Sequence, residues 1–185
     1  MAGHGWIAVL ITTLACHQAG IESQTQLQTQ SLTCDAPASR DTVPPPPRAT
    51  NQPMSAAQRD AIVAQVRAHR DAWLARRINH YRVRVSVGCF CPWPQAERVL
   101  EVRDGKAVAL FDTLGHRAGE LREPWSTQTI EAAFDNVEQT ARRVDVLAVR
   151  YDACLGFVAE TRGDSKLGLP DDWFWTRVSH LQVLR

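Results

Sequence analysis

The segment 81–91 alternates strictly between two kinds of side chain. One set is a tyrosine, valines and cysteines: Tyr81, Val83, Val85, Val87, Cys89 and Cys91. The other set is Arg82, Arg84, Ser86, Gly88 and Phe90. A period of two over this length is typical of a β-strand with one buried face. The pattern therefore predicts a strand that directs both cysteine side chains toward the protein core.

A helix is expected immediately before this strand. Ser55 and Gln58 have the spacing of a capping box, in which each side chain bonds the backbone N–H of the other residue. Apolar residues then recur at helical spacing, at Ile62, Val66, Trp73, Leu74 and Ile78. Together these signals predict a helix that begins after Ser55 and packs one side against the core.

Signals for further strands and a second helix follow. Asp104-Gly105 predicts a tight turn between strands 98–103 and 106–111, because these residues accept the positive φ angles of such turns. We expect the second helix to start at Trp125-Ser126-Thr127. Its shared apolar face would be Ile130, Phe134, Val137 and Ala141. Three more strands are expected at 144–151, 157–162 and 173–184.

These elements predict an α+β fold in which an antiparallel sheet packs against two helices. Their order is a helix plus three strands, repeated twice. The strands that end at Cys89 and Cys154, each followed by a strand with a Glu-x-Arg, suggest an internal duplication. With 185 residues, 44% of them hydrophobic, the chain can bury one core. We therefore expect residues 55–185 to form a single domain.

The N-terminus resembles an export signal. The apolar run 6–15 is too short to span a bilayer as a mature helix. It ends in Thr13-Leu14-Ala15-Cys16, which is similar to a lipobox whose cysteine receives a lipid. We therefore expect residues 1–16 to be a signal peptide with a lipobox, and Cys16 to be lipidated. The alternative is a hydrophobic strand or helix of a cytosolic protein, but the polar residues that follow offer it no partner.

Residues 17–54 are rich in Gln, Ser, Thr and Pro. This composition buries too little apolar surface to offset the entropy of the chain, so we expect a disordered linker. Such a linker would hold the domain away from a membrane surface. The formal net charge of the whole chain is +1, which gives no reason to expect a nucleic-acid partner.

Several short motifs of the folded part resemble one family. They are Trp73, Tyr81, Cys89-Phe90-Cys91-Pro92, Val102-Arg103-Asp104-Gly105, Tyr151-Asp152, Gly156-Phe157, Asp171-Asp172, Val178 and Leu181. In order and spacing they are similar to DUF6174, a family of uncharacterised and often lipoprotein-like bacterial domains. The resemblance covers residues 55–185. It implies an exported α+β domain and carries no established catalytic residue.

Four cysteines remain after Cys16 and are candidates for disulfide bonds: Cys34, Cys89, Cys91 and Cys154. An even number of cysteines in an exported chain is typical of disulfides. Cys89 and Cys91 are too far apart in an extended strand to bond each other without a bulge or turn. We favour a bond from one of this pair to Cys154 across the sheet, with the other free or bonded to Cys34.

The pair Cys89-x-Cys91 also has an alternative interpretation. Two thiolates at this spacing can bind Cu(I) or Zn, with a histidine from His80, His116 or His180. A thiol-redox role is a weaker hypothesis, because redox pairs typically have the spacing Cys-x-x-Cys at the start of a helix.

A loop with a tryptophan between two prolines follows the first strand, at Pro92-Trp93-Pro94. Trp93 and Phe90 are candidates for a binding loop, since a rigid exposed aromatic side chain can anchor a partner. The alternative is that Trp93 folds back and covers the edge of the sheet.

The sequence contains none of the common catalytic motifs, such as Gly-x-Ser-x-Gly, a phosphate-binding loop or His-Glu-x-x-His. We therefore expect a protein that is not an enzyme and needs no cofactor. The expected function is binding or structural, in the periplasm, on a lipid anchor in the outer or inner membrane. The partner would be another envelope protein or a glycan.

Overall fold

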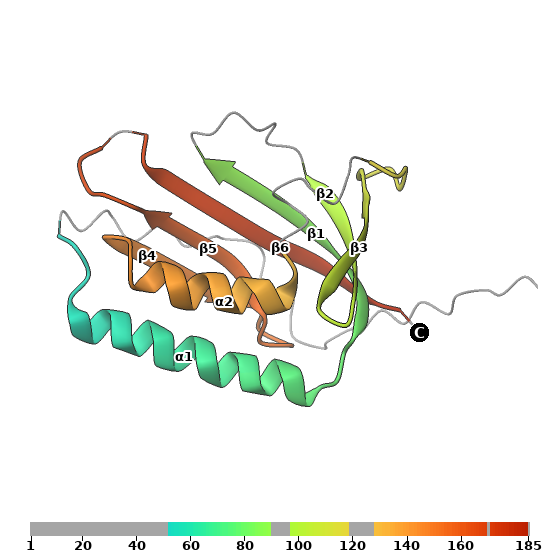
Figure 1. Ribbon diagram of the computed structural model, residues 1–185, viewed down its shortest axis with the longest axis horizontal. Helices are drawn as coiled ribbons and strands as arrows, with labels where there is room; N and C mark the ends of the chain where they lie inside the picture. Colours follow the sequence, from blue (N-terminus) through green and yellow to red (C-terminus); the bar gives the residue numbers. More distant parts are fainter. Residues whose placement is uncertain (1–51, 90–96, 119–127, 170, 185) are drawn as a thin grey trace, which may run out of the picture.

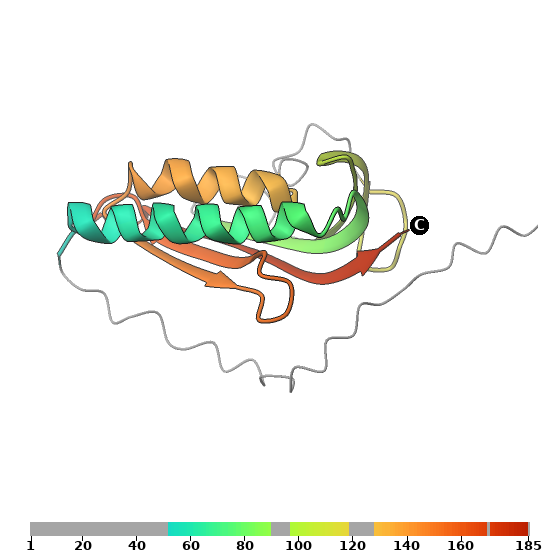
Figure 2. The same ribbon diagram turned by 90° about the horizontal axis from the view of Figure 1, so that it is seen from below.

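The computed structural model describes residues 52–89, 97–118, 128–169 and 171–184. In these residues the chain order is α1 (Ala56–Ala75), β1 (His80–Cys89), β2 (Arg98–Arg103), β3 (Lys106–Phe111), α2 (Ile130–Ala141), β4 (Val146–Tyr151), β5 (Val158–Asp164) and β6 (Trp173–Val183). The strands form one antiparallel sheet in the order β3-β2-β1-β6-β5-β4. Both helices pack on the same face of it (Figures 1 and 2). The expected α+β class, an antiparallel sheet packed against two helices, is confirmed.

The two halves of the chain share an order of elements but are not copies in space. Across the sheet, the first half reads β3-β2-β1 and the second half reads β6-β5-β4, so the chain crosses the sheet in the same direction in both halves. Because all neighbouring strands are antiparallel, each strand of the second half points opposite to its counterpart in the first. A rotation that reversed the strands in this way would move the helix to the other face, yet α1 and α2 share one face (Figure 2). The structure therefore does not support the expected internal duplication.

Helix α1 begins as its sequence predicts. Ser55 caps it, and both hydrogen bonds of the capping box with Gln58 are present. The buried residues include Val63 besides the expected Val66 and Trp73, whereas the side chain of Leu74 is 56% exposed. The buried stripe is displaced because this helix packs chiefly against α2, beside which it lies in Figure 1.

Helix α2 begins later than the sequence suggested. Its N-cap is Thr129, whose hydroxyl accepts a hydrogen bond from the backbone N–H of Ala132. The expected start at Trp125-Ser126-Thr127 lies outside the described residues. The C-terminal end of α2 is capped by a residue of α1. The Arg59 guanidinium donates hydrogen bonds to the carbonyl oxygens of Ala141 and Val144 at 2.7 and 2.6 Å. A cation is favoured there by the helix dipole.

Strand β1 has the alternation that its sequence predicts. Tyr81, Val83 and Val85 are fully or almost fully buried. They face the helices together with Leu100 and Val102, their partners on β2. The turn to β3 is also as expected, since Asp104 and Gly105 both have positive φ angles, of 50° and 72°. We call the side of the sheet toward α1 and α2 the inner face and the opposite side the outer face.

One carboxylate joins three elements at the end of the inner layer. Glu131, in the first turn of α2, accepts a hydrogen bond from the Trp73 indole at 3.0 Å and from the Tyr81 hydroxyl at 2.5 Å. The Tyr81 oxygen in turn accepts from the backbone N–H of Ile130 at 3.0 Å. Burial and the nearby Glu131 carboxylate raise the pKa of Tyr81, so its hydroxyl stays a proton donor. This network fixes the start of α2 against the end of α1 and the start of β1.

The turn between β4 and β5 packs beside this network. The Asp152 carboxylate accepts hydrogen bonds from the backbone N–H groups of Cys154 and Leu155. Tyr151 stacks on His69 of α1 with ring centroids 3.7 Å apart, and Gly156 lies under the same histidine with a φ of 74°. Trp73, Tyr81, Tyr151, Asp152 and Gly156 thus have structural roles at one end of the molecule.

Replacing Tyr81→Phe should destabilise the domain, because it leaves the buried N–H of Ile130 without its acceptor and removes one donor to Glu131. We expect the free energy of unfolding to fall by about 1–3 kcal/mol. Tyr151→Phe is the matched control, since the buried Tyr151 hydroxyl has no hydrogen-bond partner among the described residues. Chemical denaturation followed by tryptophan fluorescence measures both, and an equal loss in the two variants would contradict the assignment.

Candidate functional site

The outer face of the sheet carries polar side chains in cross-strand rows. Residues directly paired on neighbouring strands project to the same face. One row contains Arg150 of β4, Glu160 of β5, Arg177 of β6 and Ser86 of β1. The next row contains Ala148, Arg162, Trp175 and Gly88 on the same strands. Arginine is thus placed on three adjacent strands around a single glutamate.

Glu160 is the centre of this arrangement, and its side chain is only 4% exposed. Its carboxylate accepts hydrogen bonds from Arg162 Nε and from Arg150 Nη2, the latter at 3.1 Å, and Arg177 Nη2 lies 3.7 Å away. We call these four residues the Glu160 cluster. Burial alone would raise the pKa of Glu160, but the hydrogen bonds from Arg162 and Arg150 outweigh it and hold the pKa below its ordinary value.

The Glu160 cluster has more positive than negative charge. Three guanidinium groups share one carboxylate, and each has five N–H donors of which the carboxylate uses few. The side chains of Arg150, Arg162 and Arg177 remain 41%, 34% and 40% exposed. The cluster is therefore an ordered group of cations that keeps donors available to solvent or to an anionic ligand.

A second glutamate on the outer face, Glu101, has fewer basic partners than Glu160. Glu101 pairs with Arg82 Nη2 at 2.7 Å and with His80 Nε2 at 3.1 Å. Burial opposes ionisation of Glu101, but the hydrogen bonds from Arg82 and His80 lower its pKa. The Arg82 guanidinium also lies over the Phe111 ring at 4.7 Å from its centroid. Glu101 therefore pairs with both His80 and Arg82, and Arg82 also contacts the Phe111 ring.

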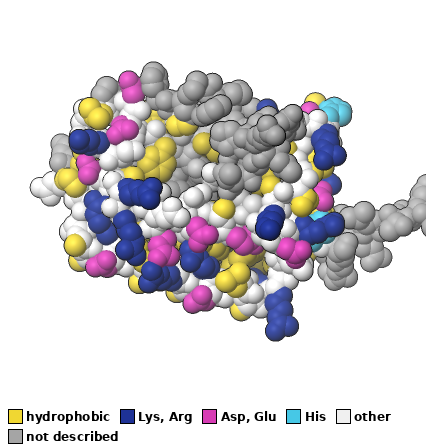
Figure 3. Space-filling model, viewed as in Figure 1, with side chains coloured by type: hydrophobic (Ala, Val, Ile, Leu, Met, Phe, Trp, Pro, Cys, Tyr) yellow, Lys and Arg dark blue, Asp and Glu magenta, His cyan; other side chains and the backbone are white. Residues whose placement is uncertain are grey.

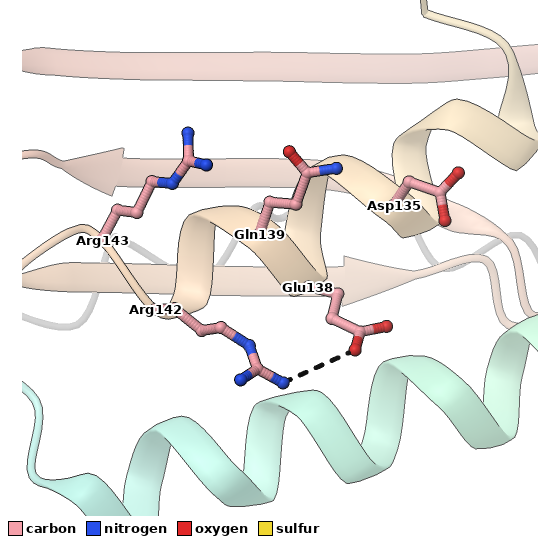
Figure 4. A pocket seen from close by; sticks show the side chains of 5 residues that line it. All are labelled: Asp135, Glu138, Gln139, Arg142 and Arg143. Carbon is pink, nitrogen blue, oxygen red and sulfur yellow. Dashed lines mark ion pairs between the residues drawn. The ribbon is translucent and has the colours of Figure 1, made fainter.

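The surface of the helices offers a groove of about 340 Å³ beside α2. Figure 4 shows its lining residues, Asp135, Glu138, Gln139, Arg142 and Arg143. Glu138 pairs with Arg142 and with Arg67 and Arg70 of α1, and Asp135 also pairs with Arg70. Basic and acidic side chains alternate along this side of the molecule (Figure 3). The groove is therefore an exposed ion-pair network between two helices and is a weaker candidate for a site.

A cleft of about 260 Å³ lies between α2 and the inner face. Its walls combine apolar side chains with hydroxyl and amide groups: Gln128, Ala133, Asn136, Thr140, Val158, Thr161, Phe174, Thr176 and Val178. None of these lining residues carries a charge. The cleft has no group that would act as an acid, base or nucleophile at neutral pH, so we do not assign chemistry to it.

The favoured disulfide joins Cys154 to either Cys89 or Cys91, and Cys91 lies outside the described residues. Cys89 ends β1 and pairs with Phe174, which is paired with Gly163 near the end of β5. Cys154 precedes the start of β5, at the opposite end of that seven-residue strand. The separation is roughly 20 Å at about 3.3 Å per residue, whereas bonded cysteines have Cα atoms about 4.4–6.8 Å apart. The register therefore argues against Cys89 as the partner of Cys154, and a bond from Cys91 to Cys154 stays a prediction.

The other predicted site residues give no metal centre in the described chain. Cys16, Cys34, Phe90, Cys91 and Trp93 lie outside the described residues. Among the residues that are described, no group of three or more His, Cys, Asp or Glu side chains could hold a metal ion. The three candidate histidines also have separate partners: His80 pairs with Glu101, His116 with Asp112 and His180 with Ser179.

The Glu160 cluster was not recognised from the sequence. The Glu-x-Arg pattern of Glu160-Thr161-Arg162 places Glu160 and Arg162 on one face of a strand but does not indicate their partners. Arg150 and Arg177 could be added only once the register of β4, β5 and β6 is known. As for membrane association, no helix in the described part of the chain is long and apolar enough to cross a bilayer.

Replacing Glu160→Gln should destabilise the domain at neutral pH, because three guanidinium groups lose their shared counter-charge. We expect a loss of about 1–3 kcal/mol near pH 7, measured by denaturant unfolding. The folded-state pKa of Glu160 is lowered, so its contribution is complete above the unfolded pKa of about 4.3 and is lost as the pH falls through the folded pKa. The difference between wild type and variant should therefore shrink in acid.

The matched control is Glu138→Gln, since Glu138 also has three arginines in reach but lies in the exposed groove between the helices. Solvent screens such pairs, so its effect should be smaller and more sensitive to salt. A Glu138 variant that loses as much stability as the Glu160 variant would contradict the special role of the cluster.

Comparison with known proteins identifies one family. No curated protein and no solved structure matches the chain. A family model described as "Family of unknown function (DUF6174)" matches residues 65–183. This match runs from the middle of α1 to the last strand and covers more than half of the chain. It includes all the strands that build the Glu160 cluster, and the chain belongs to the DUF6174 family.

Proposed function

We propose that this protein is an exported, lipid-anchored binding domain that recognises an anionic ligand with the outer face of its sheet. The observation that carries the proposal is the Glu160 cluster. There, three partly exposed arginine side chains surround one buried carboxylate, so the cluster carries two more positive charges than negative charges.

The geometry of arginine favours this function over simple solvation. A guanidinium group presents planar pairs of donors that match the oxygens of a carboxylate or phosphate. Glu160 restricts the three side chains before any ligand arrives, so less conformational entropy is lost on binding.

The remaining parts of the chain fit this role. We propose that residues 1–16 direct export, that Cys16 carries the lipid, and that residues 17–54 act as a flexible tether. In an envelope compartment, Cys34, Cys89, Cys91 and Cys154 would be oxidised, in pairings other than Cys89 with Cys154. The domain would then act without catalysis or cofactor, as a receptor for an acidic group on an envelope glycan or protein.

Binding of a small anion tests the role of the outer face. The double variant Arg150→Ala/Arg177→Ala should bind pyrophosphate at least tenfold more weakly than wild type in isothermal titration at low ionic strength. The control Arg67→Ala/Arg142→Ala removes two arginines around Glu138 and makes the same change in net charge. It should alter the affinity less than twofold, with circular dichroism confirming that both variants are folded. Equal losses, or no binding by wild type, would refute the assignment.

Acylation of Cys16 tests the proposed lipid anchor and envelope localisation. In a bacterial host, the full chain should appear in the membrane fraction and take up an alkyne-labelled fatty acid. Cys16→Ser should lose the label and move to the soluble envelope fraction, whereas Cys34→Ser should behave like wild type. A wild-type chain that is soluble and unlabelled would contradict the proposed anchor.

A further inference from the structure

Strand β6 presents two tryptophans next to the Glu160 cluster. Residues of a strand alternate between faces, and Phe174 lies on the inner face in the cleft beside α2. Trp173 and Trp175 therefore lie on the outer face, followed on the same side by Arg177. Trp173 is 42% exposed, and Trp175 is partly exposed. We call Trp173, Trp175, Arg177 and the neighbouring Arg162 the tryptophan–arginine strip.

Glycine on the adjacent strand fixes the position of the Trp175 ring. Trp175 pairs with Gly88 of β1, and a Cβ atom at Gly88 would lie only 2.1 Å from the indole Nε1. The indole thus occupies the space of the missing side chain. On the inner face, Phe174 covers Gly163 of β5 in the same way, with its Cζ 2.3 Å from the position of a Cβ. Such pairs of an aromatic residue with a glycine hold the ring against the sheet.

Charged groups flank the fixed ring on two sides. Arg162 is the cross-strand partner of Trp175 on β5, and the Arg177 guanidinium lies 5.8 Å from the Trp175 ring centroid. Successive residues on one face of a strand are about 6.5–7 Å apart. The strip therefore places two partly exposed indoles and two guanidinium groups within the length of a short extended ligand.

We propose that the tryptophan–arginine strip binds an acidic saccharide. The apolar C–H face of a sugar ring would pack on the indoles, and its carboxylate or phosphate group would pair with Arg162 and Arg177. Ser86, in the row of Arg177, and Ser179, two residues further along β6, would meet sugar hydroxyls. This inference rests on the proposed function and specifies its ligand class.

The charge of the outer face favours a saccharide over single-stranded nucleic acid. A nucleic-acid backbone has a phosphate on every residue and is bound by a continuous basic groove. On the outer face, Glu101, Glu160 and Asp164 lie between the arginines. The whole chain has a net charge of only +1. A ligand with a few acidic groups among neutral rings suits this pattern.

The experiment titrates the full exported chain with an oligomer of galacturonic acid and follows tryptophan fluorescence. We expect it to bind at least tenfold more tightly than a galactose oligomer of the same length, and more tightly than pyrophosphate or a single-stranded oligonucleotide. Trp173→Ala should weaken saccharide binding at least fivefold without changing the affinity for pyrophosphate. Leu114→Ala, which removes another exposed apolar side chain, should change neither.

Gly88→Ala provides a second variant that displaces the Trp175 ring without removing it. It should weaken saccharide binding and leave pyrophosphate binding intact, with circular dichroism reporting whether the sheet is preserved. Pyrophosphate binding that equals or exceeds saccharide binding, with no effect of Trp173→Ala, would overturn this inference and leave the proposed function standing. Tighter binding of the oligonucleotide would also overturn it. If no anion binds, both proposals fail.

Discussion

The carboxylate of Glu131 is the interaction on which the arrangement of the layers depends. It accepts hydrogen bonds from Trp73 at the end of α1 and from Tyr81 at the start of β1, while it belongs to the first turn of α2. At the opposite end, Arg59 of α1 caps the last turn of α2. The two helices are thereby held antiparallel and side by side on the inner face, so the apolar core forms on that side alone.

The outer face follows from this one-sided core. Its side chains are not required for apolar packing, so arginine and glutamate can alternate across the strands and stay partly in water. Glu160 is buried there by the arginines around it, with a pKa held low by their hydrogen bonds. Glu131 uses a carboxylate to join secondary-structure elements, whereas Glu160 uses one to arrange cations on a surface. The arginines around Glu160 keep N–H donors for a ligand, whereas the donors around Glu131 are used within the fold.

Local sequence signals were sufficient for most elements of the fold. The capping box at Ser55, the Asp104-Gly105 turn and the alternation of β1 depend on neighbours in sequence, and the structure has all three. Predictions that depended on distant contacts were less successful. Leu74 was expected in the core but is exposed, because α1 packs chiefly beside α2. Cys89 is a poor partner for Cys154, because the register of β1, β6 and β5 places the two residues at opposite ends of β5.

The amino-acid sequence by itself determined the α+β class, the faces of the strands and membership of the DUF6174 family, since each of these depends on patterns along the chain. Only the tertiary structure decided which strands are neighbours and in what register. Arg150, Glu160 and Arg177 come from three strands, and no periodicity within one strand relates them. The candidate site exists because antiparallel pairing brings these residues into one row.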